Sequence, residues 1–301
     1  MNRRRAMTVL GAAALTSCRG HEPLRTFSFI AFGTEVHFQA HGISAARFEE
    51  VSAKCSLRLR EIESLFSLYD PDSAISRLNR DGKLENPDPE FLKLLRTALD
   101  YGEKTGGIFD ITVQPLWDWR QKWKEADPAE RTAMEETTWK EALALVGYRQ
   151  VRANENAITF GKEGMAITLN AIAQGYATDQ ILSLLRKHRI AAALVNIGEY
   201  AALGNAPDGK AWTVELSATG ERIPLPSGRA LAVSAGSGYT FDPEGRFNHI
   251  FRPATGQNPR PRSTIAVTAP TATEADALST TFALASGAER REILSKFPGA
   301  T

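Results

Sequence analysis

The chain interleaves segments of helical periodicity with short extended segments, and the two kinds do not alternate strictly as strand, helix, strand. A doubly wound parallel sheet requires that alternation, so the pattern favours an α+β fold with mixed sheets and packed helices. Helices are predicted at residues 44–66, 89–104, 128–146, 172–188 and 273–285. Extended segments are predicted at residues 27–41, with a break at Gly33-Thr34, and at 148–152, 157–160, 165–169, 191–197, 212–216, 230–234, 249–251 and 264–269.

Composition excludes two broad classes of protein. The 301 residues include 36 Lys and Arg against 35 Asp and Glu, which gives a formal net charge of +1. Without a surplus of positive charge the chain cannot neutralise many phosphates, so no nucleic-acid partner is expected. Hydrophobic residues make up 43% of the chain, which is enough for a folded core and too many for a disordered protein.

The two cysteines, Cys18 and Cys55, are too few for a disulfide framework. They also exclude a four-cysteine zinc or iron–sulfur site supplied by this chain alone. Cys55 shares a helical stripe with Phe48, Val51 and Leu59. We therefore expect its thiol to be buried and inert.

The N-terminus has the pattern of an export signal. Three arginines at positions 3–5 precede a short apolar stretch at 6–15, which ends in Leu15-Thr16-Ser17-Cys18. This ending resembles a bacterial lipobox, in which Cys18 becomes the lipidated first residue of the mature protein. The expectation is a signal peptide at 1–17, a tether at 18–26, and a lipid-anchored protein of the bacterial cell envelope that faces the periplasm. An N-terminal helix with an incidental cysteine remains the alternative, and a looser resemblance to a twin-arginine signal leaves the export route open.

Residues 105–116 combine features that suit a ligand. Gly106 and Gly107 allow the backbone to approach a bound molecule closely, Phe109 offers a flat apolar face, and Asp110 and Thr112 offer polar groups. A tight turn that enters a strand would explain the same residues about equally well.

Residues 167–179 read as a strand that turns into a helix through small residues. The N-terminus of a helix presents free N–H groups and the positive end of a dipole, which suits a diphosphate. Ordinary strand–helix packing is the alternative. The segment lacks the G-x-G-x-x-G pattern, so a Rossmann dinucleotide site is not supported.

In the last predicted helix, Asp276 and Thr280 are four residues apart and therefore share one face. A carboxylate and a hydroxyl are a typical protein contribution to Mg²⁺, with phosphate oxygens and water completing the octahedron. The same spacing would also arise from capping residues on a surface helix.

These segments occur in the order that characterises the ApbE family, the FAD:protein FMN transferases. Phe32-Gly33-Thr34 resembles the family's M-G-T opening, and similar motifs continue over residues 27–290: S-x-Y-x-P-x-S-x-I-S-x-L-N, G-G-x-F-D-I-T, I-A-x-G-Y-A-x-D, H-I-x-x-P-x-T-G and A-D-A-L-S-T. The resemblance implies an ApbE-like flavin transferase fold over residues 27–301, with the ligand site in a cleft between lobes.

The resemblance also implies the reaction, a Mg²⁺-dependent transfer of FMN from FAD. A threonine hydroxyl of an exported target protein attacks the phosphorus on the FMN side, and AMP leaves. The implied partners are FAD, the target protein with its acceptor threonine, and a membrane reached through the lipid anchor.

Site residues carry over by position. The resemblance implies that Mg²⁺ is held by Asp276, Thr280 and the backbone carbonyl of Ala171, with Asp276 and His249 as catalytic residues. His249 could instead be a structural histidine with satisfied hydrogen bonds. The implied cofactor-binding residues are Phe32, Tyr69, Asn79, Phe109, Asp110, Thr112, Gln174, His249 and Thr255.

Two departures from the family pattern bear on activity. Gln174 stands where most members have lysine, and Arg252 stands where they usually have aspartate. Glutamine can donate a hydrogen bond to phosphate but supplies no charge, and Arg252 is one candidate to replace that charge. These departures motivate an alternative function, a non-transferring FAD-binding lipoprotein or an FAD pyrophosphatase. A generic solute-binding lipoprotein is a third hypothesis, which sets the resemblance aside.

Overall fold

The structure is a computed structural model that describes residues 23–259 and 264–301. The predicted signal peptide, the lipidation site Cys18 and most of the tether lie outside the described residues. Within them, no helix has both the length and the apolar character needed to cross a membrane.

The centre of the fold is an antiparallel six-stranded sheet, with strand order β1-β2-β6-β7-β10-β11. The hairpin of β1 and β2 forms one edge, and its two-residue turn lies between Ala31 and Thr34. The strands are β1 Arg25–Ala31, β2 Thr34–His41, β6 Ala192–Asn196, β7 Tyr200–Leu203, β10 Ala230–Ala235 and β11 Thr264–Ala269.

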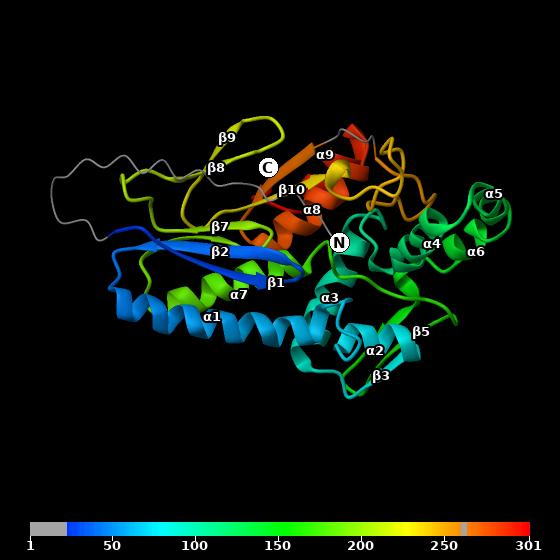
Figure 1. Cartoon of the computed structure of the whole chain (residues 1–301), viewed down its shortest axis with the longest axis horizontal. Coiled ribbons are helices and arrows are strands. Elements are labelled where there is room, and N and C mark those ends of the chain that lie inside the picture. The colour runs from blue at the N-terminus through cyan, green and yellow to red at the C-terminus, as the bar shows by residue number, and fades with distance from the viewer. Residues whose placement is uncertain (1–22, 260–263) are drawn as a thin grey trace.

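Three long helices pack against one face of this sheet: α1 Ala45–Phe66, α7 Ala173–Lys187 and α8 Ala272–Leu284. Helix α1 runs along β1 and α7, while α8 lies against β10 and β11 (Figure 1). The apolar stripe of α1 contains Phe48, Val51, Leu59 and the buried, unpaired thiol of Cys55, as the helical period predicts. Burial raises the pKa of Cys55 to about 12, which keeps the thiol protonated.

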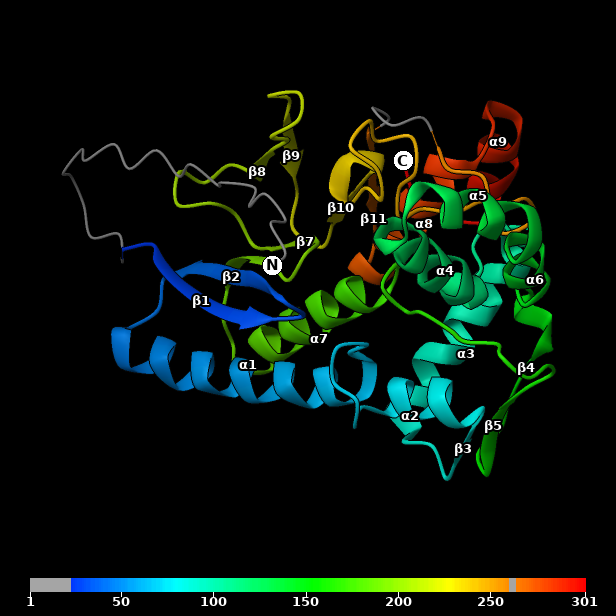
Figure 2. The same ribbon diagram turned by 45° about the vertical axis from the view of Figure 1, so that its right-hand side comes forward.

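Smaller elements complete the two ends of the molecule. A hairpin of β8 Trp212–Glu215 and β9 Arg222–Leu225 packs on Leu194, Tyr200 and Leu231 of the main sheet. A second sheet has the order β3-β5-β4, and Figure 2 shows it beside α2 and α3. These elements are α2 Ala74–Asp81, β3 Lys83–Glu85, α3 Pro89–Lys104, β4 Val151–Ala153 and β5 Ala157–Phe160.

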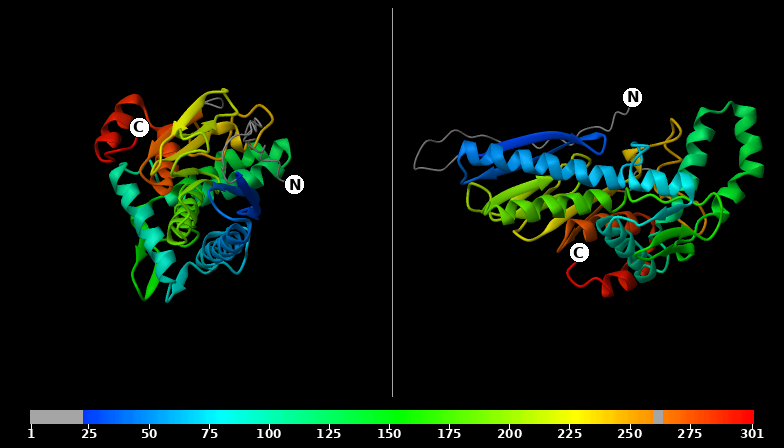
Figure 3. Two further views of the ribbon diagram at one scale, coloured as in Figure 1. Left: turned by 90° about the vertical axis from the view of Figure 1, so that its left-hand side faces the viewer. Right: turned by 90° about the horizontal axis from the view of Figure 1, so that it is seen from below.

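A helical arm extends from this second lobe, as the right-hand view of Figure 3 shows in green. It consists of α4 Gln114–Glu125, α5 Pro128–Thr137 and α6 Trp139–Ala144. The last helix, α9 Gly287–Ser295, is not part of the arm. Short 3₁₀ turns occupy Ile111–Val113, Tyr148–Gln150 and Gly236–Gly238. The guanidinium of Arg120 lies among the rings of Trp119, Trp123, Trp139 and Phe247 and holds the base of the arm together.

The α+β prediction is confirmed, and so are most of the long elements. The helix predicted at 128–146 is in fact two, because the chain turns at Thr138 between α5 and α6. The strands predicted at 165–169 and 249–251 are wrong, since both segments are irregular, and the glycine pair at 106–107 leads into a 3₁₀ turn and α4 rather than a strand. Sequence periodicity missed the helices α2, α4 and α9 and the short strands β3, β7 and β9.

The crossing of α7 and α8 requires a glycine. A Cβ atom on Gly175 would lie 2.3 Å from the carbonyl oxygen of Ala272 and 2.8 Å from Cβ of Asp276. Both neighbours belong to α8, and the first is backbone that cannot move aside without shifting the helix. The two helices can therefore approach this closely only with Gly175 at the crossing.

We expect Gly175→Ala to lower the free energy of unfolding by more than about 2 kcal/mol, because it overpacks a rigid contact. Gly287→Ala is the matched control, since its nearest neighbour would be 3.8 Å away at the flexible end of Arg291. The control should be neutral or stabilising by up to ~1 kcal/mol. Urea unfolding of both variants measures the difference, and equal effects would contradict the proposed close packing.

Candidate functional site

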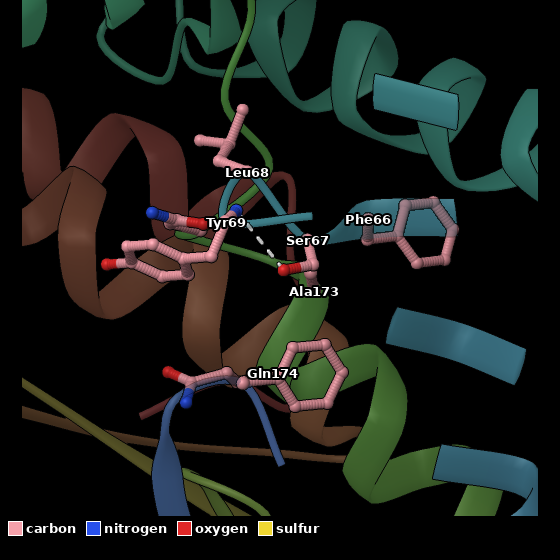
Figure 4. Close-up of a pocket in the computed structure, with 8 residues that line it drawn as sticks. Phe66, Ser67, Leu68, Tyr69, Ala173 and Gln174 are labelled. Atoms are coloured by element: carbon pink, nitrogen blue, oxygen red, sulfur yellow. Dashed lines mark hydrogen bonds between the residues drawn. The ribbon is translucent and has the colours of Figure 1, made fainter. Parts of the chain in front are cut away.

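A hollow open to solvent lies where three distant segments meet (Figure 4). It encloses about 420 Å³ of space, including the part that is open to solvent. Its walls come from the β1–β2 turn, the end of α1 and the start of α7. The lining residues are Phe32, Phe66, Ser67, Leu68, Tyr69, Asn170, Ala173 and Gln174.

The β1–β2 turn holds Phe32 at the hollow. Phe32 and Gly33 have positive φ values of 52° and 70°, as the central residues of a type I′ hairpin require. The N–H of Phe32 donates to Oε1 of Glu63 on α1, with 2.6 Å between the atoms. This bond anchors the turn to the helix and keeps the phenylalanine in a backbone conformation that is unusual for a bulky residue.

Tyr69 and Gln174 border the hollow on the side shown at the left of Figure 4. Tyr69 is 64% exposed, although it is large and aromatic, and its ring lies next to Gly33. The amide of Gln174 packs on Gly198, where a Cβ atom would be 2.6 Å from its Cδ. An exposed ring beside an amide donor is suited to a ligand with both an aromatic face and polar oxygens.

Helices α7 and α8 cap each other through two carboxylates. Oδ2 of Asp276 on α8 accepts from the N–H of Gly175 in the first turn of α7, at 2.9 Å. Asp179 on α7 accepts from the N–H groups of Ala272 and Thr273, which begin α8, at 2.8 and 2.9 Å. The start of α7, including Gln174, is thereby fixed against the helix that carries Asp276 and Thr280.

Asp276 is 4% exposed, and burial raises the pKa of its carboxyl to about 7, with a smaller contribution from the charge of Asp179. Glu199, just after β6, is also buried, and its pKa is raised by burial and by the charge of Asp276. Sequence analysis gave Glu199 no role, and only the packing of β6 and β7 against α7 and α8 brings it to Asp276. No cationic side chain of the described residues contributes to either shift, and a bound cation would lower both pKa values.

The oxygen donors at this point are a carboxylate and a hydroxyl on one face of α8. Oγ1 of Thr280 lies 3.1 Å from Oγ of Ser234 on β10, which fixes the threonine near the sheet. Among the described residues, no cluster of three or more His, Cys, Asp or Glu side chains forms a complete metal site. The donor set therefore fits Mg²⁺, which retains several waters and takes further oxygens from a phosphate substrate, better than it fits zinc.

Four predicted pocket residues are absent from the lining of the hollow. The amide of Asn79 both donates to and accepts from the backbone of Ile167, at 2.8 Å each way. Phe109 is buried in the core. Asp110 and Thr112 bond to each other and to the N–H groups of residues 147 and 148, so they hold the turn before α4.

The loop of residues 249–256 contributes no residue to the lining of the hollow, so the predicted pocket residues His249 and Thr255 are also absent from it. Nδ1 of His249 is 3.2 Å from the carbonyl oxygen of Tyr239, and the side chain of Thr255 is exposed. Arg252 forms a bidentate ion pair with Glu289 and donates to the carbonyl of Leu284. Its charge is thus already neutralised, so the hypothesis that Arg252 replaces the charge missing at Gln174 has no support.

Residues 32–301 match the sequence profile of the ApbE family. This chain belongs to the ApbE family. Because the match covers almost all of the described residues, the predicted family, the ApbE-like fold and the transferase class are confirmed.

Relatives agree with this membership. An FAD:protein FMN transferase from Haemophilus influenzae is 27% identical, over 91% of this chain and 84% of its own. The enzyme of the same name from Salmonella typhimurium is 29% identical, over 82% of this chain and 75% of its own.

Solved structures share the fold. The apo flavinyl transferase ApbE of Pseudomonas stutzeri superposes with a TM-score of 0.76 at 21% identity, covering 93% of this chain and 90% of its own. The ApbE protein of Thermotoga maritima gives 0.76 at 26% identity, covering 92% and 93%.

The raised pKa of Asp276 predicts how stability changes with pH. The folded protein holds this proton up to about pH 7, whereas an unfolded chain loses it near pH 4. The folded state therefore binds more protons between these values, and the free energy of unfolding contributed by this group falls as the pH rises from about 4 to 7. Asp276→Asn keeps an oxygen that can accept from the N–H of Gly175, but it has no carboxyl group to titrate. The variant should therefore lack this fall in the free energy of unfolding.

Urea unfolding in EDTA at pH 4.5, 6 and 8 measures this effect. The variant should gain stability relative to the original protein as the pH rises. Because Glu199 also titrates, the pH dependence should become weaker without disappearing. Parallel curves for the two proteins would contradict a protonated Asp276 in the folded state.

Proposed function

We propose that this chain is an FAD:protein FMN transferase that moves FMN from FAD to a threonine hydroxyl of a target protein and releases AMP, with Mg²⁺ as cofactor. One observation supports it above all: the hydrogen bond from Gly175 to Asp276 joins the hollow with its exposed aromatic ring to a buried carboxylate–hydroxyl pair. A flavin ring and a diphosphate need those two environments side by side.

Different residues would bind the flavin ring, the diphosphate and Mg²⁺. Tyr69 and Phe32 provide apolar surface for the flavin ring, and the amide of Gln174 at the start of α7 donates to the diphosphate. Asp276, Thr280 and the carbonyl of Ala171 would hold Mg²⁺, which acts as a Lewis acid on the phosphate oxygens when bound.

The availability of the Ala171 carbonyl has a local reason. Ala171 precedes Ile172, the N-cap of α7, and the first intrahelical bond runs from the N–H of Tyr176 to the carbonyl of Ile172. The N–H of Gly175 therefore has no partner within the helix and donates to Asp276 instead. The carbonyl of Ala171 likewise takes no part in the bonds within the helix.

The transfer itself is a displacement at phosphorus. The threonine oxygen forms a bond to the phosphorus on the FMN side, the bond from that phosphorus to the oxygen of AMP breaks, and the hydroxyl proton passes to a base. Fixing FAD between the hollow and α8 lowers the barrier by positioning the reacting groups in line. That His249 is a catalytic residue stays part of the proposal.

The location of the enzyme is part of the same proposal. The basic and apolar leader that ends at Cys18 supports a lipid-anchored protein on the periplasmic side of the cell envelope. Its targets would then be exported proteins.

The uncharged Gln174 favours one alternative, a protein that binds or hydrolyses FAD without transferring FMN. One reaction separates the three activities: purified protein with FAD, MgCl₂ and a pool of synthetic peptides that contain threonine, followed by mass spectrometry. We expect a peptide that carries FMN through a phosphoester, together with free AMP. A peptide pool with alanine for threonine should give no adduct, and Asp276→Asn should reduce the yield at least about a hundredfold.

Other products would contradict transfer to threonine. Free FMN and AMP in equal amounts, without peptide adduct, would indicate a pyrophosphatase. Intact FAD retained by the protein would indicate a binder.

The exposed ring of Tyr69 predicts a loss of affinity without a loss of stability. Tyr69→Ala removes a stacking surface for flavin, worth about 1–1.5 kcal/mol, and should weaken FAD binding roughly tenfold. Because the residue is 64% exposed, the free energy of unfolding should change by less than about 0.5 kcal/mol.

Leu57→Ala is the control for Tyr69→Ala, since Leu57 is 58% exposed on α1 and does not line the hollow. It should alter neither quantity. Quenching of FAD fluorescence gives the affinities, and unchanged affinity in Tyr69→Ala would remove this residue from the site.

A further inference from the structure

Three hydroxyl groups between β10 and α8 form a continuous chain. Oγ of Ser234 lies 3.1 Å from Oγ1 of Thr280 and 2.8 Å from Oγ of Ser279. The hydroxyl of Ser279 in turn lies 2.9 Å from the backbone carbonyl oxygen of Asp276. This series of hydrogen bonds thus begins at Thr280, one proposed Mg²⁺ ligand, and ends at the backbone carbonyl of Asp276, the other.

Only one arrangement of protons satisfies all three bonds. A carbonyl oxygen can only accept, so Ser279 must donate its single proton to Asp276. Ser279 must then accept from Ser234, whose own proton is thereby used. Ser234 must therefore accept from Thr280. The donor in each hydrogen bond is assigned from the network of partners, and no other assignment satisfies all three bonds.

This direction fixes the orientation of the Thr280 hydroxyl. Its proton points to Ser234, so its lone pairs point elsewhere and are free to bind a cation. A threonine in a helix usually donates to the carbonyl four residues earlier, as Thr281 does to Ala277 at 2.7 Å. For Thr280 that carbonyl belongs to Asp276, and Ser279 already occupies it.

We propose that Ser234 and Ser279 are positioning residues, which orient the Thr280 hydroxyl so that its lone pairs face a divalent cation held with Asp276. The proposal rests on the proposed function in one respect, that Thr280 is a Mg²⁺ ligand. Ser279 is fully buried, so water does not compete for its bond to Asp276, while Ser234 and Thr280 are half-buried.

The test is a titration of MgCl₂ at a fixed concentration of FAD, followed by thermal unfolding. Ser234→Ala removes the acceptor of the Thr280 proton, so the Mg²⁺ midpoint should rise about tenfold, equivalent to about 1.4 kcal/mol. Ser234→Thr retains a hydroxyl and should restore the original midpoint. Ser279→Ala should raise the midpoint less, about threefold, because Ser234 can still accept from Thr280.

Thr281→Val is the matched control, since it removes a buried hydroxyl of the same helix that bonds only to Ala277 among the described residues. It should lower stability without moving the Mg²⁺ midpoint. The rescue by Ser234→Thr separates positioning from a general structural role. If Ser234 had only a structural role, the alanine and threonine variants would not differ in their Mg²⁺ midpoints.

Two failures are distinguishable. If Mg²⁺ stabilises neither the original protein nor Asp276→Asn, the proposed cation site itself is wrong. If Mg²⁺ stabilises the original protein and not Asp276→Asn, while Ser234→Ala keeps the original midpoint, the site stands and the orienting role of Ser234 is wrong. Should Ser234→Ala not fold, Ser279→Ala decides by the same criterion.

Discussion

The reciprocal capping of α7 and α8 is the interaction on which the site depends. Asp276 of α8 bonds to Gly175 of α7, and Asp179 of α7 bonds to the first N–H groups of α8. Each carboxylate stabilises the positive end of the partner helix, and Gly175 lets the helices approach closely enough for both contacts. The cost is a buried carboxyl at Asp276, whose pKa is raised to about 7.

The residues of the proposed site are distributed around this crossing. The end of α1 and the β1–β2 turn bring Tyr69 and Phe32 to the start of α7, and β10 brings Ser234 to Thr280 of α8. The residues of the site come from segments more than 200 positions apart in the chain. Most of their backbone belongs to regular elements or to turns bonded to them, which favours a preorganised site.

Several motif residues form hydrogen bonds that hold neighbouring backbone segments in place. Asn79 holds the backbone of Ile167 ahead of α7, and the Asp110–Thr112 pair holds the turn that leads into the helical arm. Arg252 joins its loop to α8 and α9 through Glu289 and Leu284. These motif residues therefore contribute to packing through their hydrogen-bond partners.

The sequence alone determined the α+β class, most long helices and strands, and the pairing of Asp276 with Thr280, because periodicity and four-residue spacing are local properties. The order of the motifs along the sequence was enough to show the family resemblance. The sequence predicted strands at 165–169 and 249–251 that do not form, and it missed the short helices α2 and α9, since short or irregular segments are decided by what packs on them. It also missed α4, because the buried face of that helix includes the polar residues Gln114 and Arg120 and so breaks the apolar pattern. Only the tertiary structure placed Glu199 beside Asp276, turned Arg252 toward Glu289 and assembled the hydroxyl chain from Ser234. Those contacts join distant segments, and no local pattern in the chain encodes the distances between them.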